Sequence, residues 1–484
     1  MNPLYRASLA LRTDLYQLTM ACAYWKTGTH VKEAVFHMTF RHNPFKGGYA
    51  IACGLSSLIE FLKDFRFGED DLHYLATLSG NDGRPLLEPR FLEYLATLRL
   101  ECDIDAIPEG TVVFPHEPLV RVRGPIIACQ LLETPLLNMI NFQTLIATKA
   151  ARIFGAARDE PVLEFGLRRA HGIDGAVTAS RAAYVGGCAA TSNVLAGKLH
   201  GIPVRGTHAH SWVMSFEDEL ESFEKYAEAM PNNCVFLVDT YDTLEGVRKA
   251  VIAGKKLRDR GFRMAGIRLD SGDLAYLSIE ARKILDEGGF EDAVIVATND
   301  LSEEIIATLK EQGAKIAVWG VGTRLATAYD QPALGGVYKL GAIRAPGEPW
   351  RYTLKLSEQN EKISNPGMLQ VRRFENDKEV LMDMIYDEIQ PPDEKPAIVD
   401  PADASRTKQL SGATRHRDLL RPIFRAGECV YETPSATEAR ACAIAELARF
   451  HGGVKRFLNP HQYPVGLEKS LHEMRTRLIR AARK

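Results

Sequence analysis

The stretch Ile202–Phe216, IPVRGTHAHSWVMSF, indicates the kind of fold on which this chain is built. It begins as a short buried strand introduced by Pro203, continues as a polar turn with two histidines, His208 and His210, and ends at the acidic start of a helix. In α/β folds, polar residues just past the C-terminal end of a strand are where the chemistry is placed. The stretch therefore predicts a parallel α/β unit with a functional turn.

Three interpretations of the histidine pair are open at this point. The two side chains can be structural loop histidines. Because alternate residues of an extended backbone point to the same face, His208 and His210 can be a metal-binding pair, as in metal-dependent amidohydrolase barrels. One of them can instead be a proton shuttle or a nucleophile.

The same pattern of a short β-branched run followed by an amphipathic helix continues from about residue 160 to 345. Helices are predicted at Thr243–Asp259, Asp273–Glu287 and Ser302–Gln312. This alternation predicts parallel strands with crossover helices, and the number of units favours a closed or nearly closed barrel over an open sheet. The predicted strands lie in PVLEFG, IPVRGT, NCVFLVDT, MAGIRLDSGD, DAVIVATND and KIAVWGVGT.

Each predicted strand ends in polar or glycine residues, and in a barrel such ends converge on one mouth. Four of these residues, Asp239, Asp273, Asp300 and Thr323, can also be explained as helix N-caps. That explanation accounts for any one of them better than for all the strand ends together. The glycines of GVGT, and the pair Gly335-Gly336, are typical of loops that bind phosphate through backbone N–H groups. The strand ends are Glu164-Phe165-Gly166, Thr207-His208, Asp239-Thr240, Asp270-Ser271-Gly272-Asp273, Thr298-Asn299-Asp300 and Gly320-Val321-Gly322-Thr323.

A histidine-based metal centre does not fit the later part of the barrel. Such a hydrolase barrel needs further histidines at later strand ends, and the sequence has none between Ser211 and Arg415. A phosphate chemistry with one working histidine remains.

Composition limits the function classes further. The chain has 484 residues, 45% hydrophobic and 25% charged, which is typical of a soluble globular protein of two or three domains. A formal net charge of −2 gives no support to a nucleic-acid or polybasic membrane partner. No apolar run reaches the ~18 residues of a membrane span, and Met1–Leu18 lacks the apolar core of a secretory signal. Eight scattered cysteines without CxxC spacing suit reduced thiols in the cytoplasm.

The segments on either side of the barrel are predicted as follows. A helix capped by Thr13 or Asp14 runs to about Lys26 and carries Tyr16 in its first turn. Domains are expected at 1–125, 126–345 and 346–484. The remaining expectations are a strand at Glu33–Phe40, helices over 55–100, a β-hairpin at Val112–Gly124, one buried helix over Ile126–Phe154, β-rich structure beyond 345, a linker over Gln390–Lys408 and a helical C-terminal tail.

The order of these motifs resembles the nicotinate phosphoribosyltransferase family over Leu11 to about Tyr431. The resemblance implies an irregular TIM-like α/β barrel joined to an α/β sandwich domain built from N- and C-terminal segments. It also implies transfer of phosphoribose from PRPP to nicotinate, giving nicotinate mononucleotide and pyrophosphate in NAD salvage, with ATP as co-substrate, Mg²⁺ accompanying PRPP and ATP, and a homodimer with shared sites. The matching motifs are TDLYQLTM (13–20), FRHNPFKGGYAIACG (40–54), LLETPLLNMINFQTLIATKA (131–150), EFGLRRAHG (164–172), GTHAHSWV (206–213), VDTYDT (238–243), IRLDSGDL (267–274) and GVGTRLATAYDQPALGGVYKL (320–340).

The resemblance assigns roles to particular residues. His210 is the histidine that ATP phosphorylates, whereas His208 stands where relatives often carry an apolar residue and is expected to be dispensable. Tyr16, from the neighbouring subunit, and Phe165 are the aromatic pair around the pyridine ring. The other assigned residues are Arg168 and Arg268 over the carboxylate and pyrophosphate, Asp270 next to the ribose or base, Asp300 at the ribose, Gly322, Thr323, Gly335 and Gly336 around the 5′-phosphate, and Ser192 and Thr207 among the substrate-binding residues.

Two alternatives remain beside this assignment. The nicotinamide branch of the same fold carries an aspartate after the second barrel strand, where this chain has the neutral run Ala190-Thr191-Ser192-Asn193. An aspartate there would repel a carboxylate, so the neutral run favours nicotinate. A non-catalytic metabolite sensor that kept the barrel is the second alternative, and the intact motifs count against it.

Overall fold

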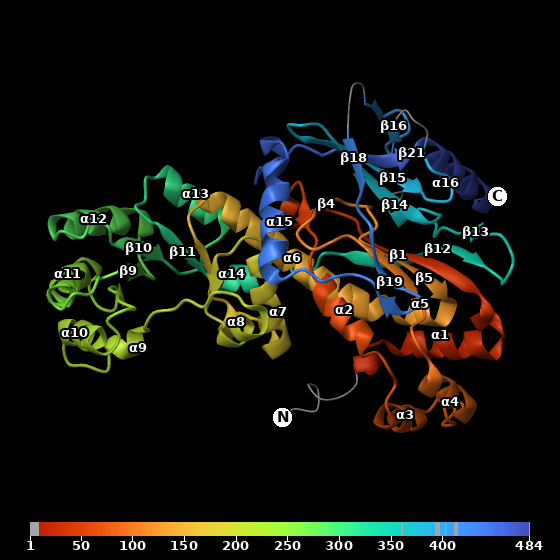
Figure 1. Ribbon diagram of the computed structural model, residues 1–484, viewed down its shortest axis with the longest axis horizontal. Coiled ribbons are helices and arrows are strands. Elements are labelled where there is room, and N and C mark those ends of the chain that lie inside the picture. The colour runs from red at the N-terminus through yellow and green to blue at the C-terminus, as the bar shows by residue number, and fades with distance from the viewer. Residues whose placement is uncertain (1–8, 360–361, 393–396, 402, 411–414, 484) are drawn as a thin grey trace. The chain divides into compact units, whose positions relative to one another are not determined.

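The computed structural model describes residues 9–359, 362–392, 397–401, 403–410 and 415–483, and they divide into two compact units (Figure 1). The first, here called the sandwich unit, comprises Met1–Leu145, Ala333–Pro434 and Cys442–Lys484. The second, the barrel unit, comprises Ile146–Pro332 and Ser435–Ala441.

The observed division differs from the domain boundaries expected at 125/126 and 345/346. Residues 126–145 and 333–345 belong to the sandwich unit. The reason for the second difference is that strand β12 (Gly336–Arg344) pairs antiparallel along its length with β1 (Glu33–Phe40). The segment 346–484 belongs, as expected, largely with the N-terminal residues.

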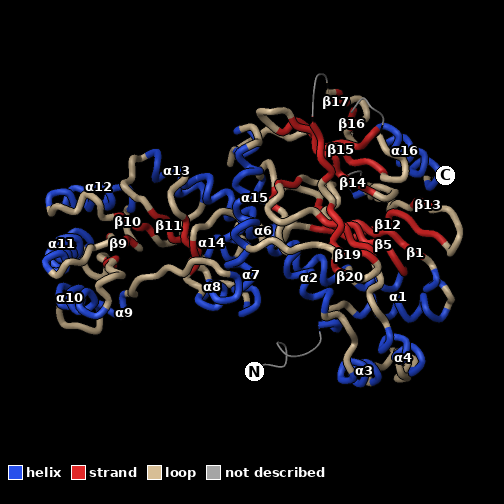
Figure 2. Tube along the Cα trace, in the orientation of Figure 1, coloured by secondary structure: helices blue, strands red, loops and turns tan. Residues whose placement is uncertain are grey.

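The barrel unit is built on a parallel sheet of six strands in the order β7-β6-β11-β10-β9-β8, counted over the described residues. Figure 2 shows helices α10 to α13 around strands β9 to β11. Strand bounds are β6 (Val162–Glu164), β7 (Ala190–Thr191), β8 (Val235–Leu237), β9 (Gly266–Leu269), β10 (Val294–Ala297) and β11 (Val318–Val321). Helix bounds are η5 (Leu167–Arg169), α7 (Gly172–Val185), α8 (Val194–His200), α9 (His210–Val213), α10 (Glu219–Ala229), α11 (Thr243–Asp259), α12 (Leu274–Glu287), α13 (Glu303–Glu311) and α14 (Thr323–Ala326).

The predicted strand at Ile202–Gly206 is reduced to a single bridge, in which Val204 pairs parallel with Thr191. Pro203 O accepts from Thr191 N at 3.0 Å, and because Pro203 has no N–H to donate on that same side, the ladder with β7 stays short. Side chains join this segment to β8 instead. Asn233 Nδ2 donates to Gly206 O at 3.3 Å, and Leu237 N donates to His208 Nε2 at 3.3 Å. The result is the nearly closed barrel that the alternation predicted.

The barrel helices follow their predicted bounds closely because their N-caps are strong. Asp242, Asp273 and Ser302 each accept a hydrogen bond from the first turn of the helix that follows. Helix α9, which begins at His210, was not predicted; the sequence indicated only a turn before the helix that Asp218 caps.

The sandwich unit contains a seven-stranded sheet, β13-β12-β1-β5-β3-β19-β20, and a six-stranded sheet, β17-β16-β21-β15-β14-β18, within the described residues. The strands not yet given are β2 (Ala50–Ile51), β3 (Asp103–Ala106), β4 (Val112–Val113), β5 (Val120–Pro125), β13 (Arg351–Tyr352), β14 (Leu369–Glu375), β15 (Val380–Asp387), β16 (Ala397–Val399), β17 (Thr407–Gln409), β18 (Arg415–Asp418), β19 (Arg421–Arg425), β20 (Glu428–Cys429) and β21 (Val465–Glu468). The remaining helices are α1 (Leu15–Lys26), α2 (Leu55–Lys63), α3 (Glu69–Ala76), α4 (Pro89–Thr97), α5 (Ile126–Leu131), α6 (Glu133–Ala157), α15 (Ala436–Ala448) and α16 (Lys469–Ala482).

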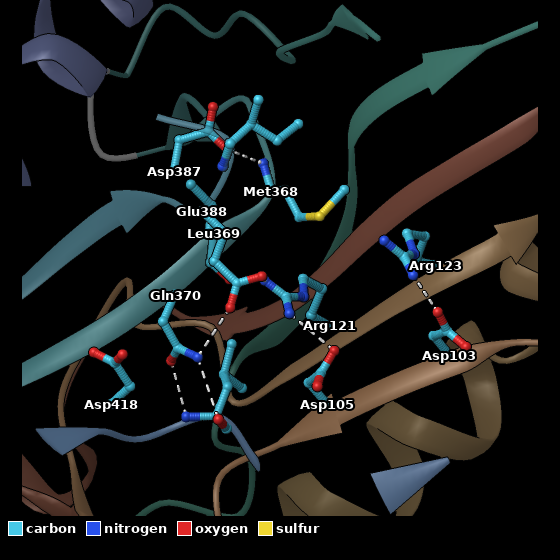
Figure 3. A network of polar contacts seen from close by, with 12 residues as sticks. Asp103, Asp105, Arg121, Arg123, Met368, Leu369, Gln370, Asp387, Glu388 and Asp418 are labelled. Carbon is cyan, nitrogen blue, oxygen red and sulfur yellow. Dashed lines mark hydrogen bonds and ion pairs between the residues drawn. The ribbon is translucent and has the colours of Figure 1, made fainter. Parts of the chain in front are cut away.

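Buried Arg121 on β5 joins the two sheets of the sandwich unit (Figure 3). Its Nη2 lies 2.9 Å from Asp105 Oδ2 on β3, in its own sheet. Its Nη1 lies 2.7 Å from Glu388 Oε2 and donates to Leu369 O at 3.1 Å, at the other sheet. The N-terminal and C-terminal segments therefore share one interior, as the resemblance implied.

Three predictions for this unit are wrong in detail. The expected hairpin at Val112–Gly124 does not form, since β4 pairs with β2 whereas β5 lies between β1 and β3. The single helix over Ile126–Phe154 is interrupted at Leu132, because Pro135 has no N–H to donate to Leu131 four residues earlier. The expected linker at Gln390–Lys408 includes β16 and part of β17, apart from positions that lie outside the described residues.

Two further observations concern the whole described chain. No described helix has the length and apolar character needed to cross a membrane. No disulfide joins the eight cysteines, all of which lie within the described ranges.

Candidate active site

The mouth of the barrel unit gathers polar side chains from the ends of three strands and from the start of one helix. His210 opens helix α9, Thr240 follows β8, Asp270 follows β9, and Thr298 follows β10. Parallel strands place their carboxyl ends on one rim, so residues far apart in sequence meet there.

His210 is held between a hydroxyl and two carboxylates. Its Nδ1 lies 3.1 Å from Thr240 Oγ1. Its Nε2 lies 3.9 Å from Asp239 Oδ1 and 3.8 Å from Asp270 Oδ2. The side chain is 38% exposed, so the ring is fixed in position and still open to a reactant.

Asp239 and Asp270 form a linked carboxylate pair. Asp239 Oδ2 accepts from Asp270 N at 2.7 Å and from Ser271 Oγ at 2.8 Å, while Thr298 Oγ1 donates to Asp270 Oδ1. Asp239 Oδ1 is buried and has no hydrogen-bond partner among the described residues. The N-cap interpretation is therefore wrong for Asp239 and correct for Asp273, which accepts from Ala275 N and Tyr276 N.

Arg268 supplies the positive charge at this rim. Its Nη1 donates to Thr207 Oγ1, and its Nε is buried without a hydrogen-bond partner in the described part of the chain. Burial lowers the pKa of Arg268, the nearby Asp270 and Asp239 carboxylates oppose this effect, and the charge of Arg168 adds to it. Two close guanidinium groups with an unused buried donor are suited to an anionic ligand.

Phe165 lies beside this polar group, at the end of β6. A Cβ on Gly320 would come within 2.8 Å of the Phe165 ring and 2.6 Å of Thr298 Cγ2, so only glycine leaves room for the ring there. The buried Glu164 carboxylate accepts from Ser180 Oγ at 2.8 Å, from Thr191 Oγ1 at 2.6 Å and from Gly166 N. Glu164 thereby fixes the backbone that carries Phe165.

The other predicted barrel residues lie on loops of the same unit. Ser192 is half-buried and its N–H donates to Glu164 O at 2.9 Å. Arg168 is exposed on η5, and Asp300 is exposed in the loop after β10, its N–H donating to Asn299 Oδ1 at 2.8 Å. Gly322 and Thr323 begin α14, where a Cβ on Gly322 would lie 3.1 Å from Phe165 O.

Tyr16, Gly335 and Gly336 belong to the sandwich unit. Tyr16 is 47% exposed in the first turn of α1, and its pKa is raised by partial burial and by Glu133. Gly335 has a left-handed backbone with φ of 75°, and Gly336 pairs with Phe40 at the start of β12. The structure therefore brings His210, Asp270, Arg268 and Thr207 to the rim, and it places the other predicted barrel residues on loops of the same unit. Tyr16, Gly335 and Gly336 lie in the other unit.

Three family models cover most of the chain. The nicotinate phosphoribosyltransferase N-terminal domain matches residues 11–141, the family model matches 161–350, and the C-terminal domain matches 370–475. The chain belongs to the nicotinate phosphoribosyltransferase family.

Relatives and solved structures agree with this membership. The nicotinate phosphoribosyltransferase of Bacillus subtilis is 45% identical and is matched over 97% of each chain. The human nicotinate phosphoribosyltransferase is 36% identical, over 97% of this chain and 96% of the human one. The crystal structure of human nicotinic acid phosphoribosyltransferase superposes with a TM-score of 0.83 at 33% identity, covering 96% of this chain and 99% of that chain.

His208 is a structural residue in this member of the family. It is 8% exposed, its Nε2 accepts from Leu237 N, and its ring packs 4.8 Å from that of Tyr226. Burial lowers the pKa of His208 to about 4. His208 joins the segment before α9 to β8 through this hydrogen bond, so we expect it to matter for stability.

We expect His208→Ala to destabilise the protein and to change its acid sensitivity. The variant leaves Leu237 N–H without an acceptor, a loss of about 1–3 kcal/mol. In the wild type, the folded pKa of about 4 lies below the unfolded value of 6.5, so the neutral ring contributes stability that is complete above pH 6.5 and is lost as the pH falls through 4. That contribution is on the order of 3 kcal/mol.

Urea unfolding between pH 4 and 8 tests this expectation. His208→Ala should show a smaller loss of unfolding free energy over this range than the wild type. His37, also buried with a pKa lowered to about 3, is present in both proteins and cancels in the comparison. Equal pH dependence in the two proteins would contradict the structural role.

Sequence reasoning missed several residues that the structure places at the rim. Asp239 was considered as a strand end or a helix cap, and Thr240, Thr298 and Glu164 only as strand ends, so none of the four was given a role in the site. The signal was available for Asp239, which follows β8 as Asp270 follows β9. Their mutual contacts depend on tertiary structure and left no pattern in the sequence.

Proposed function

We propose that the chain is a nicotinate phosphoribosyltransferase that transfers phosphoribose from PRPP to nicotinate, coupled to ATP hydrolysis through phosphorylation of His210. The observation that carries the proposal is the position of His210 Nε2, within 4 Å of two carboxylate oxygens, on the rim that Arg268 shares. The enzyme acts in the cytoplasm as a homodimer, in NAD salvage.

In the transfer step, nicotinate nitrogen forms a bond to C1 of the ribose while the bond from C1 to pyrophosphate breaks. Positive charge develops on the ribose, so catalysis depends on positioning and charge stabilisation. The carboxylate of Asp270 stabilises that charge. Arg268 and Arg168 bind the departing pyrophosphate and the nicotinate carboxylate.

In the ATP step, His210 acts as the nucleophile. When Nδ1–H donates to Thr240 Oγ1, Nε2 carries the lone pair. Nε2 forms a bond to the γ-phosphorus while the bond from that phosphorus to the ADP oxygen breaks. The phosphohistidine adds about −1.5 to −2 charge at the rim, if it behaves like other phosphorylated side chains. Water later releases it as inorganic phosphate.

The carboxylates fit a Mg²⁺ ion that arrives with its substrates. No group of three or more His, Cys, Asp or Glu residues suited to a metal occurs within the described ranges. The unpartnered Asp239 Oδ1 and the adjacent Asp270 can supply two oxygen ligands, and phosphate oxygens and water the rest. When bound, Mg²⁺ neutralises pyrophosphate charge.

A steady-state assay with nicotinate or nicotinamide, each with and without ATP, tests the proposed function. We expect nicotinate mononucleotide and pyrophosphate to form from nicotinate, and ATP to stimulate the reaction. Preference for nicotinamide would favour the other branch of the fold, and PRPP binding without turnover would favour a metabolite sensor. Either result would contradict the proposal.

The shared-site arrangement predicts subunit complementation. If Tyr16 reaches the partner's site, each site contains Tyr16 from one subunit and Asp270 from the other. Tyr16→Ala and Asp270→Ala then each remove one of these two residues. Mixing the two inactive proteins should restore activity up to about one quarter of the wild-type level, because random exchange makes half the dimers mixed, with one intact site each. No recovery after subunit exchange, verified by mass spectrometry, would rule out sharing through Tyr16.

A further inference from the structure

A cavity of about 700 Å³ lies in the sandwich unit, and all the residues that line it belong to that unit. Its walls come from the loop after β1, the segment before β21, and α16. Cavities of about 300–1,000 Å³ are the usual size for small-molecule sites. None of the residues that line it is among the site residues named above.

The lining of the cavity is strongly cationic. Its ionisable side chains include four that are permanently positive, three histidines and one carboxylate. An excess of positive charge in a concave site raises the local concentration of anions. The residues are Arg41, Lys46, Arg406 and Arg475, then His42, His116 and His461, and finally Asp400.

Arg475 is the buried member of this set. It is 6% exposed, and its Nη atoms donate to two carbonyls, Pro401 O at 3.2 Å and Ile363 O at 3.4 Å. Its Nε is buried and has no hydrogen-bond partner in the described segments. Burial lowers the pKa of Arg475, and no described carboxylate forms an ion pair with it.

Two other buried arginines of the same unit form ion pairs with carboxylates. Arg373 lies 2.6 Å from Asp383 Oδ2 and 3.1 Å from Glu446 Oε2, and Arg121 is paired with Asp105 and Glu388. A buried cation without a counter-charge destabilises the fold. The position of Arg475 in a cavity wall supplies a reason for its retention, because a bound anion would provide the missing charge.

We propose that this cavity is a second ligand site, which binds the phosphate or polyphosphate group of a small metabolite with Arg475 as its buried anchor. The guanidinium fork matches phosphate oxygens, and the exposed side chains of Lys46 and Arg406 add positive charge to the lining. Phe114 and Tyr463, whose rings stack with centroids 4.2 Å apart, provide an apolar wall for an organic group. The claim concerns binding and does not rest on the proposed reaction.

Isothermal titration calorimetry with inorganic pyrophosphate tests the proposal. The wild type is expected to bind pyrophosphate at two sites per chain. Arg268→Ala should weaken the site at the barrel mouth, and Arg475→Met should weaken the other at least tenfold. Arg406→Ala, at an exposed position, should weaken the same second site without depending on core packing. The matched control is Arg477→Met, an exposed arginine on α16 outside the cavity, which should leave both sites unchanged.

The two sources of phosphate are compared in the Arg268→Ala protein. If ATP binds tenfold or more tightly than pyrophosphate, the cavity recognises a nucleotide. If the two bind equally, it recognises only the polyphosphate group. Both results support the site. Pyrophosphate binding that Arg475→Met and Arg406→Ala leave unchanged would overturn it, as would a lower melting temperature of Arg475→Met with normal binding. A single site lost in both Arg268→Ala and Arg475→Met would also overturn it, because the cavity would then belong to the catalytic site.

Discussion

Arg268→Ala is expected to lower kcat/KM for phosphoribosyl transfer by about 10²–10³-fold, the usual effect of removing one preorganised electrostatic group. The guanidinium places an unused buried donor at the barrel rim, next to the charge of Arg168. An unpaired donor is available to the pyrophosphate that departs in the reaction. The melting temperature should change little, since the half-buried side chain lies at the mouth of the barrel and is not part of the apolar core.

Asp270→Asn should produce a loss of similar size with even less change in structure. The amide oxygen can still accept from Thr298 Oγ1, but the negative charge 3.8 Å from His210 Nε2 is gone. The matched control is Arg263→Ala, an exposed arginine just before β9 whose ion pair with Asp292 is also exposed. Steady-state kinetics and thermal melts of all three variants test the expectation. Normal turnover by Arg268→Ala or Asp270→Asn would remove that residue from the site.

His210→Ala should abolish labelling of the protein from γ-³²P-ATP and remove the stimulation by ATP. Transfer itself should persist at high PRPP concentration, because the proposed mechanism assigns the charge stabilisation to Arg268, Asp270 and Mg²⁺. The KM for PRPP should rise about tenfold or more, and each factor of ten corresponds to ~1.4 kcal/mol of coupling.

His208→Ala is the control for this experiment, measured at a temperature where the destabilised variant remains folded. This variant should keep both labelling and ATP stimulation. In the wild type the His208 ring contacts Leu237 N and Tyr226 and not the carboxylate pair. Labelling that survives in His210→Ala, or that is lost only in His208→Ala, would reverse the assignment of the two histidines.

Much of the barrel could be predicted from the sequence because its signals are local. Helix α11 begins and ends where the apolar periodicity and the cap at Asp242 place it. The start of α12 and both ends of α13 differ from the predicted bounds by one residue. The glycine and polar residues that follow the β-branched runs are also a local signal, and they predicted which residues lie at the mouth of the barrel. The absence of later histidines in the sequence was enough to set aside a histidine metal centre.

The predictions that failed depended on pairing partners or on single backbone donors. The segment Val112–Gly124 has suitable strand residues for a hairpin. Its two strands pair with more distant strands instead, β4 with β2 and β5 with β1 and β3. Nothing local distinguishes β12 from another barrel strand until β1 pairs with it. In both cases distant segments compete to pair with the same strand. The residue pattern within one segment does not show which partner is preferred.

By itself, the sequence determined the parallel α/β barrel and the family, because short-range patterns and ordered motifs carry that information. It also nominated His210 as the working histidine, which stays a prediction. Only the tertiary structure separated the two histidines physically, by burying His208 against Tyr226 and placing His210 beside Asp239 and Asp270. It alone also placed Arg475 in the wall of a mainly cationic cavity, with no ion pair to a carboxylate among the described residues. Burial and the neighbours of a charge arise from contacts between residues distant in sequence, so they exist only once the chain has folded.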